Sequence, residues 1–315
     1  MKKLLSTLLS VFVILSTFNI IYVNKTKACE NSEKINFDIH IRTPEDFKRF
    51  IDNFNDGLLK TDCSVILDEN IEIEDRILDP IGTPCRPFSG IFDGNLKSIN
   101  LSVDEGNFMY ALFGYTNNAT LKNIIVNGHI ISEHSAGIVI DARSTEIYNC
   151  SNYANIRATK YAAAGIALYL YNCTVSDCCN GGTIYSVDNA GGIVFVVKKS
   201  NITNCSNYAP IYCSYGFLGG IVSIAKTDCQ VKSCDIGDNC LFLITREGEE
   251  NIKTPMDNFM DDIDEAINGY NKNKPYLKRN FGISKSLVGL STGENVVIEG
   301  SNIVDNCVGV YKIEQ

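Results

Sequence analysis

The sequence predicts an all-β protein folded as a parallel β-helix, in which the chain winds through successive coils of about 27 residues. Two columns of residues recur in register at nearly constant steps. The first, with steps of 26, 28, 27 and 29 residues, holds Ile124, Cys150, Cys178, Cys205 and Cys234. The second, with steps of 26, 28, 27 and 28 residues, holds Ala111, Gly137, Gly165, Gly192 and Gly220. Self-similarity at such a period is typical of stacked repeat architectures.

The composition of each repeat favours strands over helices. Every copy contains short apolar runs, mostly of Ile, Val, Leu, Tyr and Cys, that are separated by Gly, Asn and Ser. No run has the length or the period of an amphipathic helix, whereas these residue types suit a pleated strand. Three short strands and three bends would make one coil, and equivalent positions would stack roughly 4.8 Å apart in neighbouring coils.

The recurring columns predict a scaffold rather than a site. We expect the cysteine column to face inward as free thiols, because thiols behave as small apolar side chains and disulfide geometry is demanding. A serine there should destabilise more than an alanine, since its hydroxyl would lack a partner. The glycine column predicts a corner or a close backbone approach. A further column should bond through its amides from coil to coil; it holds Asn152, Asn180 and Asn207.

The first 28 residues predict a secretion signal. Lys2 and Lys3 precede an apolar stretch, and cleavage is expected after Ala28. A membrane anchor that stays uncleaved and a lipoprotein with Cys29 as acceptor are the alternatives. The chain is therefore expected to be secreted or to lie at the cell surface, with no membrane insertion after cleavage. Its net charge of −9, or −13 without the four lysines of residues 1–28, disfavours nucleic acid as a partner.

Residues 29–62 are predicted to form a lead-in and a capping helix. Thr43 and Pro44 are typical of a helix start, and apolar residues then recur on one face. The helix is expected to cover the open N-terminal end of the β-helix, whose strand edge would otherwise be unpaired. Its apolar face holds Phe47, Phe50, Ile51 and Phe54.

The β-helix itself is expected over residues 63–245. Residues 246–280 then interrupt the pattern with a polar insertion, in which Thr254 and Pro255 predict the start of a short acidic helix. Residues 281–315 would supply a terminal coil or cap.

Several motifs resemble the GLUG-repeat family of exported bacterial β-helix proteins. The resemblance covers residues 39–240. It rests on Pro80-Ile-Gly82, Phe88-Ser-Gly-Ile-Phe-Asp-Gly-Asn95, Ala111-Leu-Phe-Gly114, and repeats of Gly-Gly-Ile-Val with Asn-Cys-x-Asn. It implies a right-handed parallel β-helix at the cell exterior, similar to surface adhesins and to repeats beside the protease domain of IgA-cleaving metallopeptidases. It implies no activity by itself.

No catalytic motif was found in the sequence. The three histidines His40, His129 and His134 do not form the His-Glu-x-x-His pattern of zinc peptidases, and no Cys-x-x-Cys pair indicates a metal. We therefore expect no enzymatic activity, no metal and no cofactor. The alternative is a carbohydrate-active hydrolase or lyase, for which Asp141 and Glu146 are the nearest acidic neighbours; both are expected on solvent-side turns.

Tyrosines supply the candidate binding residues. Tyr153 and Tyr208 share one column, and Tyr185 and Tyr212 share another. Such rings on a flat face can dock a sugar or a protein loop, although tyrosine is also an ordinary outward strand residue. The sequence thus favours an adhesin-like binding or display module, whose partner is an unknown host or bacterial surface protein or a glycan. A carbohydrate-active enzyme and a structural spacer are the alternatives.

Overall fold

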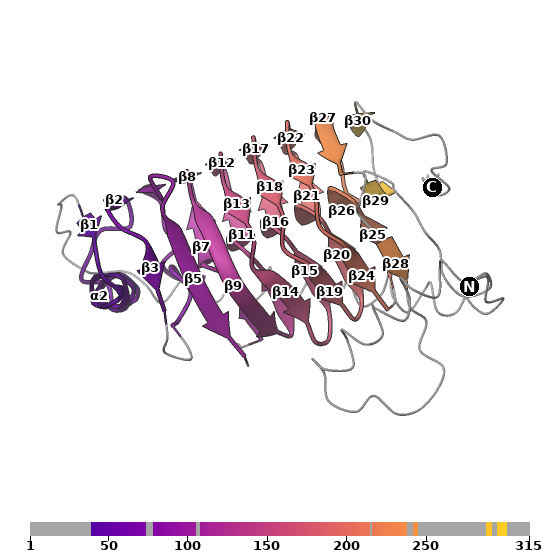
Figure 1. Cartoon of the computed structure of the whole chain (residues 1–315). Coiled ribbons are helices and arrows are strands. Elements are labelled where there is room, and N and C mark those ends of the chain that lie inside the picture. Colours follow the sequence, from indigo (N-terminus) through magenta and orange to yellow (C-terminus); the bar gives the residue numbers. More distant parts are fainter. Residues whose placement is uncertain are drawn as a thin grey trace.

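The computed structural model describes residues 39–73, 78–104, 108–214, 216–237, 242–244, 288–291 and 295–300. These residues form a right-handed parallel β-helix of about seven coils (Figure 1). The predicted fold class is confirmed. The predicted signal segment and the predicted helical insertion of residues 246–280 lie outside the described residues, and the domain boundaries stay predictions.

The largest sheet has 19 strands and consists of two ladders. The first ladder contains β1 (Ile39–Ile41), β2 (Ser64–Leu67), β4 (Ile91–Asp93), β8 (Thr120–Lys122), β12 (Glu146–Tyr148), β17 (Thr174–Ser176), β22 (Asn201–Thr203), β27 (Gln230–Ile236) and β30 (Val297–Gly300). The second ladder contains β3 (Ile71–Glu72), β5 (Ser98–Val103), β9 (Ile125–Ser132), β13 (Ser151–Asn152), β14 (Asn155–Ala158), β18 (Cys179–Asn180), β19 (Ile184–Ser186), β23 (Ser206–Asn207), β24 (Ile211–Cys213) and β28 (Phe242–Ile244).

Two smaller sheets close the coils from β6 onward. The five-stranded sheet contains β6 (Met109–Tyr110), β10 (His134–Ala136), β15 (Ala162–Ala164), β20 (Asn189–Gly191) and β25 (Leu218–Gly219). The six-stranded sheet contains β7 (Phe113–Asn117), β11 (Val139–Arg143), β16 (Ala167–Tyr171), β21 (Val194–Lys198), β26 (Val222–Ala225) and β29 (Val288–Ser291). Paired strands run parallel and belong to neighbouring coils, as in Ile147 beside Val175, so sequence columns become stacks in space.

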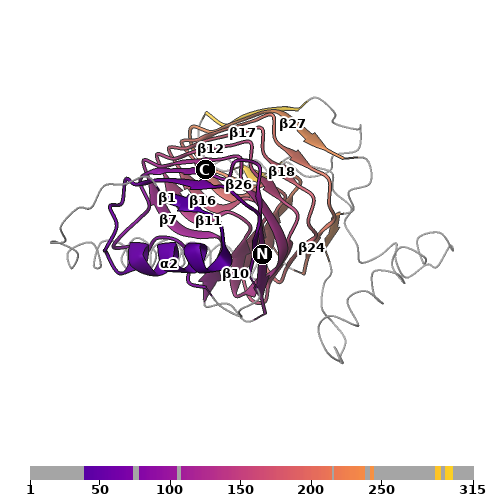
Figure 2. The same ribbon diagram turned by 60° about the vertical axis from the view of Figure 1, so that its left-hand side comes forward.

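The helix α2 (Pro44–Asn55) lies at the N-terminal end of the coils (Figure 2). Thr43 caps it, since its hydroxyl accepts from the backbone N–H of Asp46 at 3.1 Å. The buried face of α2 packs on the first coils: the Phe54 and Phe88 ring centroids lie 5.5 Å apart. The helix therefore covers apolar side chains at the strand edge of the β-helix.

The cysteine column lies inside the β-helix. Cys150, Cys178, Cys205 and Cys234 are buried and free. The Cys178 thiol lies 3.2 Å from the carbonyl oxygen of Ser176, and the other three have the same arrangement. A serine hydroxyl at Cys178 would therefore have an acceptor. The expectation that a hydroxyl in this column would lack a hydrogen-bond partner is wrong.

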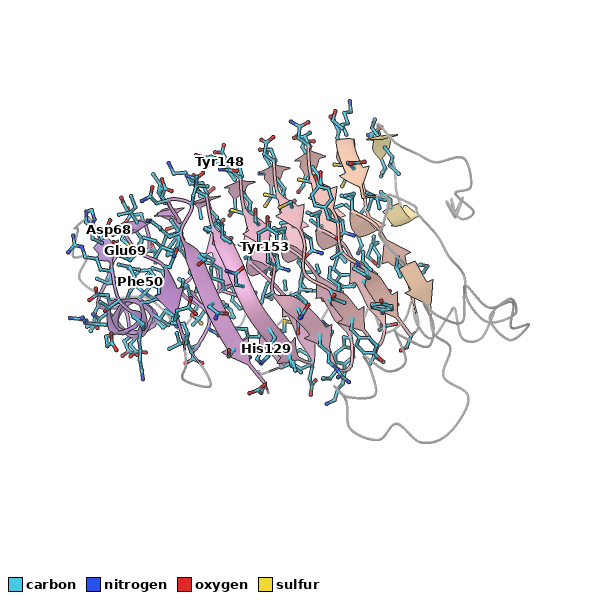
Figure 3. All side chains as sticks on the ribbon, in the orientation of Figure 1. Phe50, Asp68, Glu69, His129, Tyr148 and Tyr153 are labelled. Atoms are coloured by element: carbon cyan, nitrogen blue, oxygen red, sulfur yellow. The ribbon has the colours of Figure 1, made fainter. Side chains whose placement is uncertain are left out.

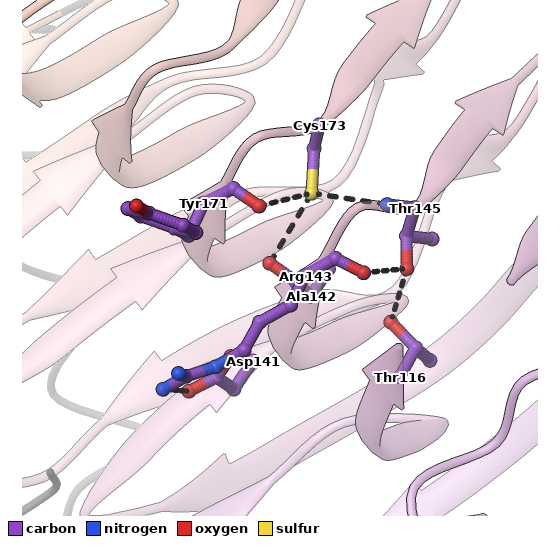
Figure 4. Close-up of polar contacts among 7 residues, drawn as sticks. All are labelled: Thr116, Asp141, Ala142, Arg143, Thr145, Tyr171 and Cys173. Atoms are coloured by element: carbon purple, nitrogen blue, oxygen red, sulfur yellow. Dashed lines mark hydrogen bonds and ion pairs between the residues drawn. The ribbon is translucent and has the colours of Figure 1, made fainter. Parts of the chain in front are cut away.

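A second column of small residues stacks at the corner between the six-stranded sheet and the first ladder. The repeat pattern does not reveal this column, because its members differ in type. The column holds four buried residues, Thr145, Cys173, Ser200 and Cys229. The backbone N–H of Thr145 donates to the Cys173 thiol at 3.4 Å (Figure 4). The backbone N–H of Cys173 in turn donates to the Ser200 hydroxyl at 2.9 Å. These side chains satisfy backbone groups that a bend leaves without a ladder partner.

Candidate binding surface

Tyr153 and Tyr208 lie on the outer face of the second ladder, directly after β13 and β23 (Figure 3 labels Tyr153). Asn152, Asn180 and Asn207 are in register, so the column that follows them reads Tyr153, Gly181, Tyr208. The two rings are therefore two coils apart, roughly 10 Å. The two residues are 52% and 55% exposed, respectively.

A glycine lies beneath each ring. A Cβ atom added to Gly181 would lie 2.6 Å from Cδ1 of Tyr153, and one added to Gly237 would lie 3.0 Å from Cδ1 of Tyr208. Each ring thus occupies the space that a side chain of the next coil would need. Backbone bonds hold both residues: the Tyr153 N–H donates to Val126 at 2.7 Å and the Tyr208 N–H to Asn180 at 2.8 Å.

The polar groups next to Tyr153 are uncharged. The Tyr153 hydroxyl lies 3.9 Å from the Cys179 sulfur, and the Cys179 thiol lies 3.2 Å from the Ser151 hydroxyl. The neighbouring Cys179 raises the pKa of Tyr153, so the phenol stays neutral at physiological pH. A ring face with hydroxyl and thiol groups beside it suits a neutral polar ligand better than a charged one.

The second tyrosine column is packed. Tyr185 and Tyr212 are directly paired in β19 and β24, but Tyr212 is only 4% exposed. The Arg157 guanidinium carbon lies 5.2 Å from the Tyr185 ring centroid, and the Tyr185 hydroxyl lies 3.4 Å from that of Ser214. Of the four candidate tyrosines, Tyr153 and Tyr208 offer exposed rings, whereas Tyr212 does not.

Asp141 is not on a solvent-side turn, so that expectation is wrong. It lies within β11, is 4% exposed, and pairs with Arg143 at 3.1 Å between Oδ1 and Nε (Figure 4). Burial raises the pKa of Asp141, and Arg143 partly opposes this rise. Glu146 is exposed on β12 of the first ladder. The two carboxylates thus belong to different sheets, and the structure does not bring them together as a pair.

The three histidines have separate environments. His40 pairs with Asp68 at 3.1 Å and His129 with Asp104 at 2.8 Å. The buried His134 ring stacks on Tyr161 with centroids 4.5 Å apart, and burial lowers its pKa to about 3. Among the described residues, no group of three His, Cys, Asp or Glu side chains is arranged to hold a metal ion.

Two further aromatic residues that the sequence did not indicate are exposed, Phe108 and Tyr171. Tyr171 ends β16 and is 41% exposed, with lysines from the next coil close to its ring. The step of 27 residues from Tyr171 to Lys198 equals the coil length, and this spacing would have indicated the cluster.

Comparison with known proteins found no matching family model, no similar curated protein and no similar solved structure. In the part of the chain that the structure describes, no helix has the length and apolar character needed to span a membrane.

Proposed function

We propose that this chain is a divergent GLUG-repeat β-helix that acts outside the cell as a non-enzymatic, adhesin-like binding module. The order of motifs along residues 39–240 and the predicted signal segment support export and the family assignment. The repeated coils provide a rigid support on which a flat ligand surface can be held.

The exposed pair Tyr153 and Tyr208 carries the proposal. Each ring lies over a glycine of the next coil and is more than half exposed. A tyrosine offers a large contact area with few rotatable bonds, so little entropy is lost when a ligand docks on it. The proposed ligand is a neutral glycan or a polar protein loop that spans both rings.

A structural spacer remains the plainest alternative, because outward tyrosines are common in strands. A screen of the exported chain against neutral glycans and host surface proteins separates the two functions. We expect a ligand whose binding free energy weakens by about 1–3 kcal/mol in Tyr153→Ala/Tyr208→Ala, as is usual for docked aromatic residues.

The matched control is Tyr148→Ala, which removes an outward ring from β12 of the neighbouring first ladder. Both variants should retain the melting temperature of the wild type within a few degrees. Binding that is unchanged in the double variant, or reduced equally in the control, would reject the surface. Turnover of a polysaccharide that requires Asp141 or Glu146 would instead favour the carbohydrate-active enzyme.

A further inference from the structure

A second surface lies where the strands of the six-stranded sheet end. Arg143, Tyr171 and Lys198 are directly paired in β11, β16 and β21. Val197 pairs with Ala225, which places Lys226 beside Lys198 in the next coil. One outward column therefore runs through four successive coils. Its members, in chain order, are Arg143, Tyr171, Lys198 and Lys226.

The lysines gather around the ring. The Nζ atom of Lys198 lies 5.8 Å from the Tyr171 ring centroid, and that of Lys199 lies 5.9 Å from it. Both lysines are exposed. A cation at this distance is attracted by the ring electrons, so Tyr171 holds two ammonium groups beside each other. We call Tyr171, Lys198, Lys199 and Lys226 the lysine patch.

Among the described residues, no ion pair neutralises the lysines of the patch. Arg143 pairs with Asp141, but none of the ion pairs formed by the described residues includes Lys198, Lys199 or Lys226. Neighbouring like charges on paired strands are destabilising. The chain as a whole carries a net charge of −9, so a cluster of cations that form no ion pair with the described residues is contrary to its overall composition.

Lys199 lies at a corner of the coil whose backbone conformation lysine rarely adopts. Its φ is 51°, in the left-handed region. Equivalent corners in other coils hold Asn118, Ser144, Asn172 and Asp228. Asparagine and aspartate enter this region more readily than lysine, whose side chain cannot bond locally to the backbone. The corner requires this conformation in each of these coils, and it carries the exposed Lys199 directly after Lys198.

We propose that the lysine patch binds a linear anionic glycan that lies along the axis of the β-helix. Cations in neighbouring coils are roughly 4.8 Å apart, which is close to the length of one sugar unit in an extended polysaccharide. Carboxylate or sulfate groups of the glycan would meet the lysines of the patch, and one sugar ring would lie on Tyr171. An extended acidic peptide fits less well, since it offers no sugar ring to lie on Tyr171.

The lysine patch is separate from the surface of Tyr153 and Tyr208. The patch lies where the strands of the six-stranded sheet end, and in each coil a strand of the first ladder lies between the patch and the second ladder. The two proposals therefore fail independently. Tyr153→Ala/Tyr208→Ala should bind anionic glycans as the wild type does, and loss of lysines from the patch should not affect a neutral ligand.

The test measures binding of the full chain to four immobilised polymers at low and moderate salt. Polygalacturonate supplies carboxylates, heparin supplies sulfates, hydroxyethyl cellulose is the neutral control, and poly-glutamate is the acidic peptide. We expect binding to one or both anionic glycans, which weakens as salt rises. Lys198→Gln/Lys199→Asn should lower that affinity roughly tenfold, because two of the three cations of the lysine patch are lost.

The matched control is Lys48→Gln/Lys97→Gln, which removes the same charge near the N-terminal end and should change affinity less than about twofold. Lys199→Asn alone should leave the melting temperature unchanged or higher, so weaker binding would not reflect unfolding. The proposal is overturned if neither anionic glycan binds, if the control double variant loses as much affinity, or if poly-glutamate binds as tightly as the glycans.

Discussion

The side-chain amide of Asn152 donates to Oδ1 of Asn180 at 2.8 Å, inside the β-helix and away from solvent. Asn180 repeats the arrangement with Asn207 at 2.7 Å. Each amide also donates to the backbone carbonyl two residues later. The ladder links three coils through buried polar groups, and such a network fixes the register of the coils because any slip would leave its members without partners.

The position within the asparagine ladder should determine its contribution to stability. Asn180→Ala removes a bond from both Asn152 and Asn207, and it also frees the carbonyl of Gly182. We expect it to lower the free energy of unfolding by about 2–4 kcal/mol. Asn152→Ala should cost less, because Oδ1 of Asn152 has no hydrogen-bond partner in the folded chain. Urea unfolding of both variants tests this order; an equal or smaller loss for Asn180→Ala would contradict it.

A glycine that packs against backbone should tolerate alanine less well than a glycine that packs against a side chain. A Cβ atom on Gly165 would lie 2.3 Å from the Gly192 carbonyl oxygen and 2.8 Å from the Asn180 side chain. Because neither neighbour can move without breaking the ladder, Gly165→Ala should cost about 2–4 kcal/mol. Gly181→Ala meets only the ring of Tyr153, which can rotate, so thermal unfolding should reveal a smaller loss. Similar melting temperatures for the two variants would be inconsistent with the stacked glycine column.

Serine should replace Cys173 more readily than alanine. One coil later, Ser200 already occupies the equivalent corner and its hydroxyl donates to the Lys198 carbonyl at 2.8 Å. Cys173→Ser should therefore change stability by less than about 1 kcal/mol, whereas Cys173→Ala removes the acceptor for the Thr145 N–H and should cost about 1–2 kcal/mol. Chemical denaturation in reducing buffer checks the order of the two variants, and a larger loss for serine would show that the corner excludes hydroxyls.

Acidification should destabilise the fold through His134. Burial lowers its folded pKa to about 3, below its ordinary value of 6.5. Between these values the unfolded chain binds more protons than the folded chain, so stability is lost as pH falls below about 6.5. Both ring nitrogens lack a hydrogen-bond partner, which means that a charge there would be uncompensated.

The variant His134→Phe isolates this effect. Phenylalanine can keep the stacking on Tyr161 but cannot take up a proton. The stability difference between wild type and variant should shift by about 2–4 kcal/mol in favour of the variant from pH 7 to pH 4. Burial also raises the pKa of Asp188 to about 6, but that group is present in both proteins and cancels in the comparison. A difference that does not depend on pH would exclude His134 as the titrating group.

The repeat allowed much of the fold to be predicted, because each coil contacts mainly its neighbours and a constant step in sequence becomes a stack in space. The site was predicted less well. Strand alternation assigns Tyr212 and Tyr153 alike to the outer face, yet one is buried and the other exposed, since exposure depends on what packs outside the coil. Asp141 was misplaced because it lies in a strand of the six-stranded sheet that buries residues on both faces.

The most direct test of the proposed binding surface is a double-mutant cycle at Tyr153 and Tyr208. With the neutral ligand returned by the screen, affinities are measured for Tyr153→Ala, Tyr208→Ala and the double variant. If one ligand spans both rings, the two single substitutions should each lower affinity and their effects should couple by about 0.5 kcal/mol or more. Affinity equal to that of the wild type in all three variants, with their folds intact, would contradict the assignment of this surface as the docking site.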